Sequence, residues 1–244
     1  MRIAYPLALA LSLSAVNSYA VEANVTEAVA TTSYNSNVAA SLDNIADKIR
    51  AYKQKNPNAN DAELNKYAES LLQTDVKQSP QSVSRAAVSS VYTDMDGYVN
   101  GYLNPQENAL YNSNRAKALL CMANGKKAIS ATQERYKNIE TVVHNGNGDA
   151  FRHAIWNFGM TNDVGADFAK KWSDAHEYGA VVDYPLERTM DLYNNSIGIN
   201  LGKNNPTVLL TSTFANLTQQ QVRAGKMKVI SNNKLVWSNS NGEK

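Results

Sequence analysis

Two of the chain's three histidines, His153 and His176, lie in segments with the pattern of amphipathic helices. The next such segment begins at Pro185 and carries Asp191. Two imidazoles and one carboxylate are the usual ligands of a catalytic zinc ion or of another divalent first-row metal, and they leave one position for water. The metal lowers the pKa of that water and produces a nucleophile near neutral pH. His153, His176 and Asp191 are therefore the metal ligands that the sequence predicts.

The same residues also fit a reaction that uses no cofactor. Asp149 lies four residues before His153, so the two side chains can meet on one helix. If Asp149 or Asp191 orients His153, the imidazole can act as a general base that activates water directly. In either mechanism Arg152 suits an anionic group such as phosphate. The sequence leaves both mechanisms open.

The first of the three helices is expected from Asp149 to Thr161. Its apolar face comprises Ala150, Phe151, Ala154, Ile155 and Phe158. Its other face comprises Asp149, Arg152, His153, Trp156 and Asn157. Tryptophan beside histidine is unusual on a solvated face, so we interpret this face as a second packing surface that carries polar groups into a site. Gly146 and Gly148 precede this helix and permit positive φ, either in a plain turn or where the backbone approaches a ligand.

The second and third helices are expected to bring further polar groups to the same place. In the second, His176 shares a face with Phe168, Trp172 and Ala175 and should point inward, while Glu177 lies about 100° further round. In the third, one line of side chains contains Glu187, Asp191, Asn194 and Gly198. Glycine inside a helix costs about 1 kcal/mol relative to alanine, so Gly198 indicates that another backbone comes close.

Composition limits the class of protein. The 244 residues suit one or two domains, and the formal net charge of +2 gives no electrostatic case for nucleic acid or an anionic membrane. Cys121 is the only cysteine, which excludes an intramolecular disulfide and a thiolate-rich zinc site. We interpret it as a small buried apolar residue.

Residues 1–20 have the pattern of a secretory signal peptide. Arg2 is followed by an apolar run from Ile3 to Val16, and Ser18-Tyr19-Ala20 ends it with small residues. Cleavage after Ala20 would place the protein in the periplasm or outside the cell. No later segment reaches about eighteen apolar residues, so we expect no transmembrane helix.

The rest of the chain divides by pattern. Residues 21–41 are expected to be a disordered leader, and residues 42–80 an accessory helical hairpin with Asp61 capping its second helix. The main helical domain is expected at 84–237 and a polar tail at 238–244. Within that domain Asn104 and Glu107 predict a capping box that opens a helix through Leu120, and residues 228–237 predict two short strands. The fold class is mainly α: a helical bundle-like domain with a small C-terminal β-hairpin.

The segment GDAFRHA at 148–154 carries a resemblance to a known family, together with Trp156-Asn157, His176-Glu177 and MDLYNN at 190–195. It resembles a bacterial family of domains of unknown function that occur in secreted proteins and at the C-terminal ends of toxin-like proteins. The resemblance covers about residues 103–237 and implies no reaction. It implies as motif positions Asp149, Arg152, His153, His176, Glu177, Asp191, Asn194 and Asn195. The order of the His, Glu and Asp residues is also similar to that of helical metal phosphohydrolases, with shorter spacings and Glu177 in place of Asp.

The predicted function is an exported, toxin-like hydrolase acting on a phosphoester, in phospholipid or nucleic acid, or on another envelope component. The catalytic group is expected to be His153, His176, Asp191 and Glu177. The substrate-binding group is expected to be Arg152, Asn194, Asn195, Asp149 and Trp156. The alternative is a non-enzymatic periplasmic or secreted protein, structural or binding, whose buried polar network only fixes the packing of helices. Neither the substrate nor the oligomeric state follows from the sequence.

Overall fold

The structure is a computed structural model, and it describes residues 41–75, 103–137, 144–179, 184–206 and 211–244. The chain divides into two compact units, residues 1–119 and 120–244. Helices are the main elements and a single antiparallel pair of strands is found in the described ranges, which confirms the predicted mainly α fold. The predicted signal peptide, the leader up to residue 40 and the boundary expected at residue 84 lie outside these ranges. None of the described helices is long and apolar enough to span a bilayer.

Unit 1 contains a helical hairpin formed by residues 41–55 and by α3 (Asp61–Asp75). The rings of Tyr52 and Tyr67 stack between the two helices with centroids 4.2 Å apart. The cap of α3 is Asn60, not Asp61 as predicted, because Glu63 lies three residues further on and completes a capping box with Asn60 in both directions.

A second capping box opens α5 (Pro105–Ser113), where Asn104 and Glu107 hydrogen-bond each other's backbone amides as predicted. The helix does not continue to Leu120, because Asn114 leaves the helical conformation and its side chain caps α6 (Arg115–Arg135). The same side chain donates to Asp61 in α3. α6 passes through Asn124-Gly125 as a continuous helix.

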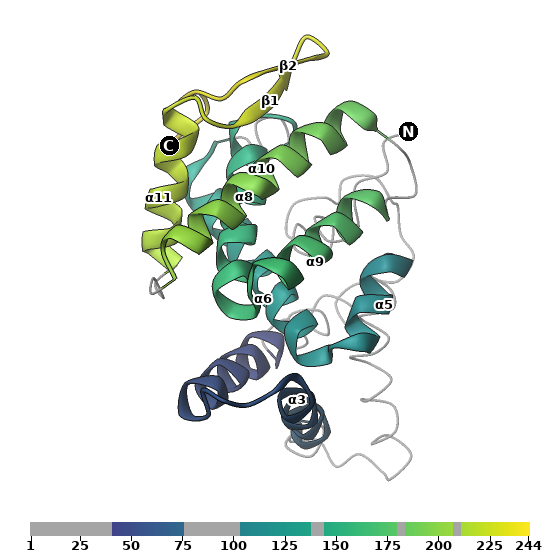
Figure 1. The fold of residues 1–244 in the computed structure, drawn as a ribbon. Coiled ribbons are helices and arrows are strands. Elements are labelled where there is room, and N and C mark those ends of the chain that lie inside the picture. Colours follow the sequence, from purple (N-terminus) through teal and green to yellow (C-terminus); the bar gives the residue numbers. More distant parts are fainter. Residues whose placement is uncertain (1–40, 76–102, 138–143, 180–183, 207–210) are drawn as a thin grey trace, which may run out of the picture. The chain divides into compact units, whose positions relative to one another are not determined.

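Unit 2 is built around α8 (Figure 1). Its elements are α8 (Asn147–Val164), α9 (Ala166–Tyr178), α10 (Pro185–Asn204), α11 (Thr211–Arg223), β1 (Lys228–Ser231) and β2 (Lys234–Trp237). α8 packs against α9, α10, α11 and β1, and all but three of its side chains are buried. The polar face of α8 is therefore a second packing surface, as the sequence predicts.

A close crossing joins α8 to α10. A Cβ atom added at Gly198 would lie 2.1 Å from the carbonyl oxygen of Ala154, and one added at Gly202 would lie 2.5 Å from Cβ of Thr161. These contacts confirm that a backbone approaches Gly198. Residues advance together along the two helices, so α8 and α10 run in the same direction, and Asp149 and His153 face the part of α10 that carries Asp191.

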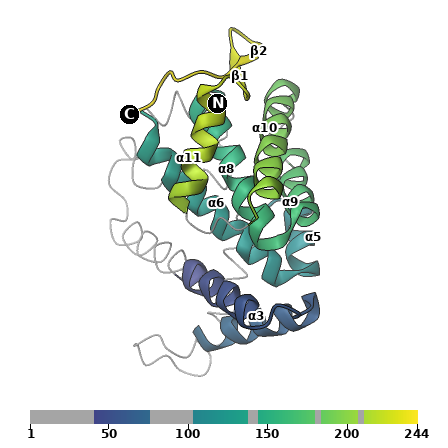
Figure 2. The same ribbon diagram turned by 60° about the vertical axis from the view of Figure 1, so that its left-hand side comes forward.

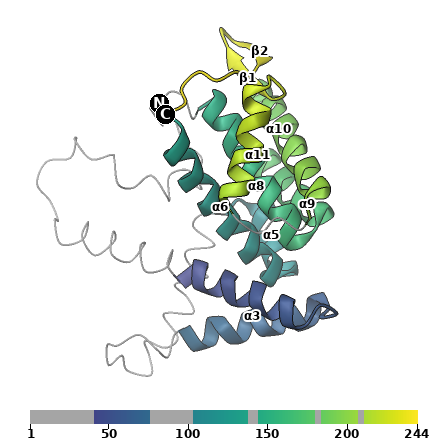
Figure 3. The ribbon, with the colours of Figure 1, turned by 90° about the vertical axis from the view of Figure 1, so that its left-hand side faces the viewer.

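The hairpin lies at one end of unit 2 in all three views (Figures 2 and 3). Its strands pair Lys228 with Trp237 and Ser231 with Lys234, as the sequence predicts, and the turn between them places Asn232 and Asn233 at positive φ. The amide of Asn194 in α10 makes two hydrogen bonds of 2.9 Å with the backbone of Lys228 and so anchors β1.

The segment expected as a polar tail is docked on unit 2. Asn147 in the first turn of α8 exchanges hydrogen bonds with Asn239 and donates to the carbonyl of Asn241. Arg223 pairs with Glu243, and the backbone of Glu243 forms a bridge with Tyr136. These contacts hold the C-terminal residues against α8, α11 and the end of α6.

We predict that Gly198→Ala destabilises the protein by about 3 kcal/mol, because the new methyl group has to push two helix backbones apart. Chemical denaturation followed by far-UV circular dichroism measures the change. Asn200→Ala is the matched control, since Asn200 is exposed on the same helix and should change stability by at most about 0.5 kcal/mol. Equal stability for the two variants would contradict a tight crossing.

Candidate active site

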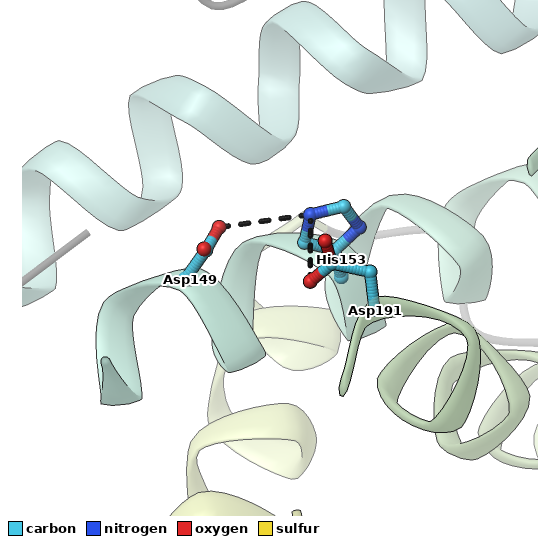
Figure 4. A group of neighbouring side chains, drawn as sticks. All are labelled: Asp149, His153 and Asp191. Atoms are coloured by element: carbon cyan, nitrogen blue, oxygen red, sulfur yellow. Dashed lines mark ion pairs between the residues drawn. The ribbon is translucent and has the colours of Figure 1, made fainter. Parts of the chain in front are cut away.

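A cluster of buried polar side chains occupies the place where α8, α9 and α10 meet. We call it the polar centre; it comprises Asp149, Arg152, His153, Glu177, Asp191 and Asn195. Figure 4 shows its middle, where Asp149 and His153 project from α8 toward Asp191 on α10. His153 is 2 % exposed, whereas the side chains of Asp191 and Arg152 keep 13 % and 18 %, the largest exposed fractions in the polar centre.

The contacts of His153 fix its tautomer. The Nη2 of Arg152 lies 2.8 Å from Nε2 of His153, and because a guanidinium can only donate, Nε2 accepts. The proton is then on Nδ1, which donates to Oδ1 of Asn195 at 3.2 Å. Burial, together with the charge of Arg152, lowers the pKa of His153 to about 3. At neutral pH the imidazole is uncharged and its Nε2 lone pair points into the polar centre.

Asn195 links His153 to α9. Its Oδ1 accepts from His153 and from Asn157 at 2.7 Å, and its Nδ2 donates to Oε1 of Glu177 at 3.0 Å. Oε1 of Glu177 also lies 3.4 Å from Nδ1 of His153. Burial raises the pKa of Glu177 above its ordinary value. Asn195 and Glu177 thus hold the ring of His153 from the side opposite Nε2.

Asp149 is held as a carboxylate. Burial alone would raise its pKa, but the nearby Arg152 and His153 and the backbone amide of Asn145 bring the pKa below its ordinary value. Its Oδ2 accepts from that amide at 2.8 Å and its Oδ1 accepts from Arg152 at 2.6 Å. Its place in the first turn of α8 also favours the negative charge.

The charge of Asp191 is less well supported, although the nearby Arg152 also favours it. Its Oδ1 is buried and has no hydrogen-bond partner among the described residues, and lies 3.4 Å from Nε2 of His153. Burial, with the negative charges of Asp149 and Glu177, raises the pKa of Asp191 well above its ordinary value. A buried acceptor without a donor is costly, so this oxygen is the position in the polar centre where a proton or a cation is needed.

One oxygen from each aspartate and one nitrogen of His153 lie within 4.8 Å of one another, close enough to bind one metal ion. His176 was predicted as the second imidazole ligand, and it is not in this group. The imidazole of His176 instead packs against the indole of Trp156, with centroids 5.2 Å apart. The last turn of α9 buries both His176 and Glu177, and it is Glu177 that faces His153. Asp149, and not the predicted His176, is the third member of this group.

Two residues expected to bind substrate have other partners. The amide of Asn194 is fully buried on β1, and the indole Nε1 of Trp156 donates to the carbonyl of Cys121 at 3.0 Å. Cys121 itself is fully buried, as predicted. Of the predicted substrate-binding group, Arg152 keeps the largest exposed fraction.

Asn145 is not among the predicted site residues. Its φ of 67° makes it the left-handed residue before α8, whereas Gly146 has a φ of −103° and Gly148 lies inside the helix. Its amide nitrogen reaches Asp149, its side chain donates to Glu187 and its carbonyl accepts from Ile230. Asparagine tolerates this conformation better than most residues, so an Asn-Gly pair before a helix was the available signal.

Fold and site together define a mainly α domain with a buried Asp-His-Asp group, of the kind that can hold a divalent metal. Residues 108–226 match the family model described as a domain of unknown function, DUF6973. This agrees with the predicted resemblance to a family without a known reaction. No curated protein and no solved structure matches the chain.

We predict that stability falls as the pH is lowered from about 6.5 toward 3, because the unfolded chain takes up a proton on His153 before the folded protein does. Denaturation at a series of pH values measures the loss, which should amount to a few kcal/mol. In His153→Gln, which cannot ionise, the fall over this range should be shallower. Nitrogen NMR of His153 should show a neutral ring with the proton on Nδ1 at pH 5. A charged ring at that pH would contradict the assignment.

Proposed function

We propose that the protein is a metal-dependent hydrolase whose metal is bound by Asp149, His153 and Asp191. The observation that carries the proposal is the unpartnered, buried Oδ1 of Asp191, which faces the Nε2 lone pair of His153. Nε2 accepts from Arg152, so it carries no proton that it could donate to this oxygen. A divalent ion would contact both atoms and Asp149 as well.

The spacing of the three groups supports this proposal. Nε2 of His153 lies 3.6 Å from Oδ1 of Asp149 and 3.4 Å from Oδ1 of Asp191. Two ligand atoms of a tetrahedral zinc ion, each about 2.1 Å from it, are about 3.4 Å apart. Two carboxylates and one imidazole suit zinc and related first-row ions, and an ion held by three protein ligands keeps a position for water.

The remaining residues of the polar centre would support the ligands. A bound divalent ion supplies a water molecule of lowered pKa. Asn195 and Glu177 hold Nδ1 of His153, and such partners fix the orientation of a ligand imidazole and raise its basicity. The guanidinium of Arg152 can bind a phosphate group through two parallel hydrogen bonds. A phosphoester, in phospholipid or nucleic acid, is therefore the preferred substrate class, with other envelope components as further candidates.

We also propose that the protein acts after export. The predicted signal peptide favours the periplasm or the medium, and the resemblance to domains of toxin-like proteins favours a target in a cell envelope. These points come from the sequence, and the geometry of the polar centre is compatible with any of these targets.

The second candidate is a non-enzymatic exported protein in which the polar centre only fixes helix packing. The deep burial of His153 and Asp149 and their contacts with Arg152 favour it. The two candidates differ in what they require of Asp191. A packing role needs its charge or its hydrogen bonds, whereas a ligand role leaves it unfavourable until the metal binds.

We predict that Asp191→Asn prevents metal binding, yet leaves the chelator-treated protein as stable as wild type or about 1 kcal/mol more stable at neutral pH. Asparagine keeps the shape of Asp191 without its charge. Since the folded pKa of Asp191 is raised, the stability that its protonated form contributes is present below about pH 4 and is lost as the pH rises through the folded value. The His153 contribution is common to both proteins, so the stability of wild type relative to Asp191→Asn should fall as the pH rises from 5 to 9 in denaturation measurements.

Elemental analysis and activity on bis-p-nitrophenyl phosphate, phospholipid vesicles and single-stranded DNA complete the test. Wild type should retain a stoichiometric first-row metal and hydrolyse one of these substrates, and Asp191→Asn should do neither. Asp167→Asn, which neutralises an exposed carboxylate of α9, should behave as wild type. A large loss of stability in Asp191→Asn, with no metal in the wild type, would support the packing role and exclude the proposed function.

A further inference from the structure

We propose that the guanidinium of Arg152 occupies the metal position in the metal-free protein, and that metal binding releases it to hold an anionic group of the substrate. The proposal rests on the proposed metal site. It assigns two successive roles to one side chain: a resident cation before the metal arrives, and a substrate-binding group afterwards.

The geometry places one nitrogen of Arg152 against two of the three ligand atoms. Its Nη2 lies 2.6 Å from Oδ1 of Asp149 and 2.8 Å from Nε2 of His153. A zinc ion bound to the same two atoms would lie about 2.1 Å from each. The two positions overlap, so the ion and the guanidinium exclude each other.

The surrounding negative charges stabilise the guanidinium in this position. Burial opposes its charge, yet Asp149, Asp191 and Glu177 together raise the pKa of Arg152 above its already high value. The Oδ1 of Asp149 and the lone pair of His153 thus have a donor when no metal is present. Only Oδ1 of Asp191, the third ligand atom, is left without one.

Of the side chains of Arg152, Asp149 and His153, that of Arg152 is the one that reaches solvent. The side chain of Arg152 keeps 18 % of its surface exposed, against 4 % for Asp149 and 2 % for His153. Rotation of its long side chain can carry the guanidinium to solvent while α8 stays in place. An arginine displaced in this way remains beside the metal, where a planar guanidinium is suited to a phosphate group.

Metal affinity measured by calorimetry tests the first role. Chelator-treated wild type, Arg152→Gln and Arg152→Lys are titrated with Zn²⁺ and, separately, with Mn²⁺. Glutamine can still donate to Asp149 or His153 but carries no charge, whereas lysine keeps the charge. Removal of a competing charge at this distance should strengthen metal binding by about tenfold or more in Arg152→Gln. Arg152→Lys should bind the metal with an affinity close to that of wild type.

The outcomes separate the inference from the proposed function. If wild type binds metal and Arg152→Gln binds it no more tightly, the inference is wrong and the metal site stands. If neither protein binds metal, both are wrong. If only Arg152→Gln binds, Arg152 is the resident cation, and the wild-type protein is not a metal-dependent enzyme.

Folding of the variant is checked in the same experiment. Loss of the charge leaves Asp149 buried without its cation, so metal-free Arg152→Gln should be less stable than wild type. Saturating Zn²⁺ should raise its melting temperature more than it raises that of wild type, because the ligand is bound more tightly by the folded state. A variant that stays unfolded with Zn²⁺ present would contradict the inference, since the ion would then fail to replace the guanidinium.

Inorganic phosphate tests the second role. Wild type loaded with Zn²⁺ should bind phosphate more tightly than Zn²⁺-loaded Arg152→Gln by about tenfold, and metal-free wild type should bind it no better than the metal-free variant. Equal phosphate affinity for the two loaded proteins would show that the released guanidinium does not hold the anion.

Discussion

The crossing of α8 and α10 is the contact on which the rest of unit 2 depends. Gly198 and Gly202 remove the side chains that would keep the two helices apart: Gly198 lies against the backbone of Ala154, and Gly202 against the side chain of Thr161. Because the helices run in the same direction, one crossing sets the whole register between them. Asp191 is thereby placed opposite His153, and Asn195 opposite Asn157.

That register explains why polar residues can be buried so densely without a disulfide or a large charge imbalance. Most of the buried polar groups near the crossing have hydrogen-bond partners. These partners lie on α9, α10 and β1, three elements that pack against α8. Asn195 serves His153, Asn157 and Glu177 with one amide, and Asn145 serves Asp149, Glu187 and β1 from one backbone turn. The Oδ1 of Asp191 is one of several buried oxygens without a hydrogen-bond partner, among them Oδ1 of Asn145 and Oδ1 of Asn157. It differs from these two amide oxygens because it belongs to a carboxylate and lies 3.4 Å from Nε2 of His153. A cation-binding site requires such an unfavourable carboxylate, whereas helix packing does not.

Sequence patterns predicted the elements of unit 2 well and the ligand set in part. Helix periodicity placed His153 and Asp191 on buried faces. Pro185 predicted the start of α10, and Gly198 predicted the close approach of another backbone. The pattern failed for His176 and Glu177, since neighbouring residues in the last turn of a helix are both buried and a 100° rotation does not decide which one reaches a given partner. Asn194 was predicted to bind substrate, and its amide contacts the backbone of β1; an amide that anchors a strand and an amide that binds a ligand look alike in sequence. The break at Asn114 and the cap at Asn60 were not predicted. Several neighbouring polar side chains can hydrogen-bond the free backbone amides at a helix start, and the sequence does not show which of them does.

The indole of Trp156 gives the protein an internal optical probe. Its ring contacts the imidazoles of His153 and His176 edge-on, so its fluorescence emission responds to changes in the charge or position of either ring. Trp237 is about half exposed and emits at longer wavelength than a buried indole, which separates its signal from that of Trp156. Trp172 is buried like Trp156, so its replacement by phenylalanine leaves Trp156 as the one buried indole. Events at the polar centre can then be followed in real time without a label.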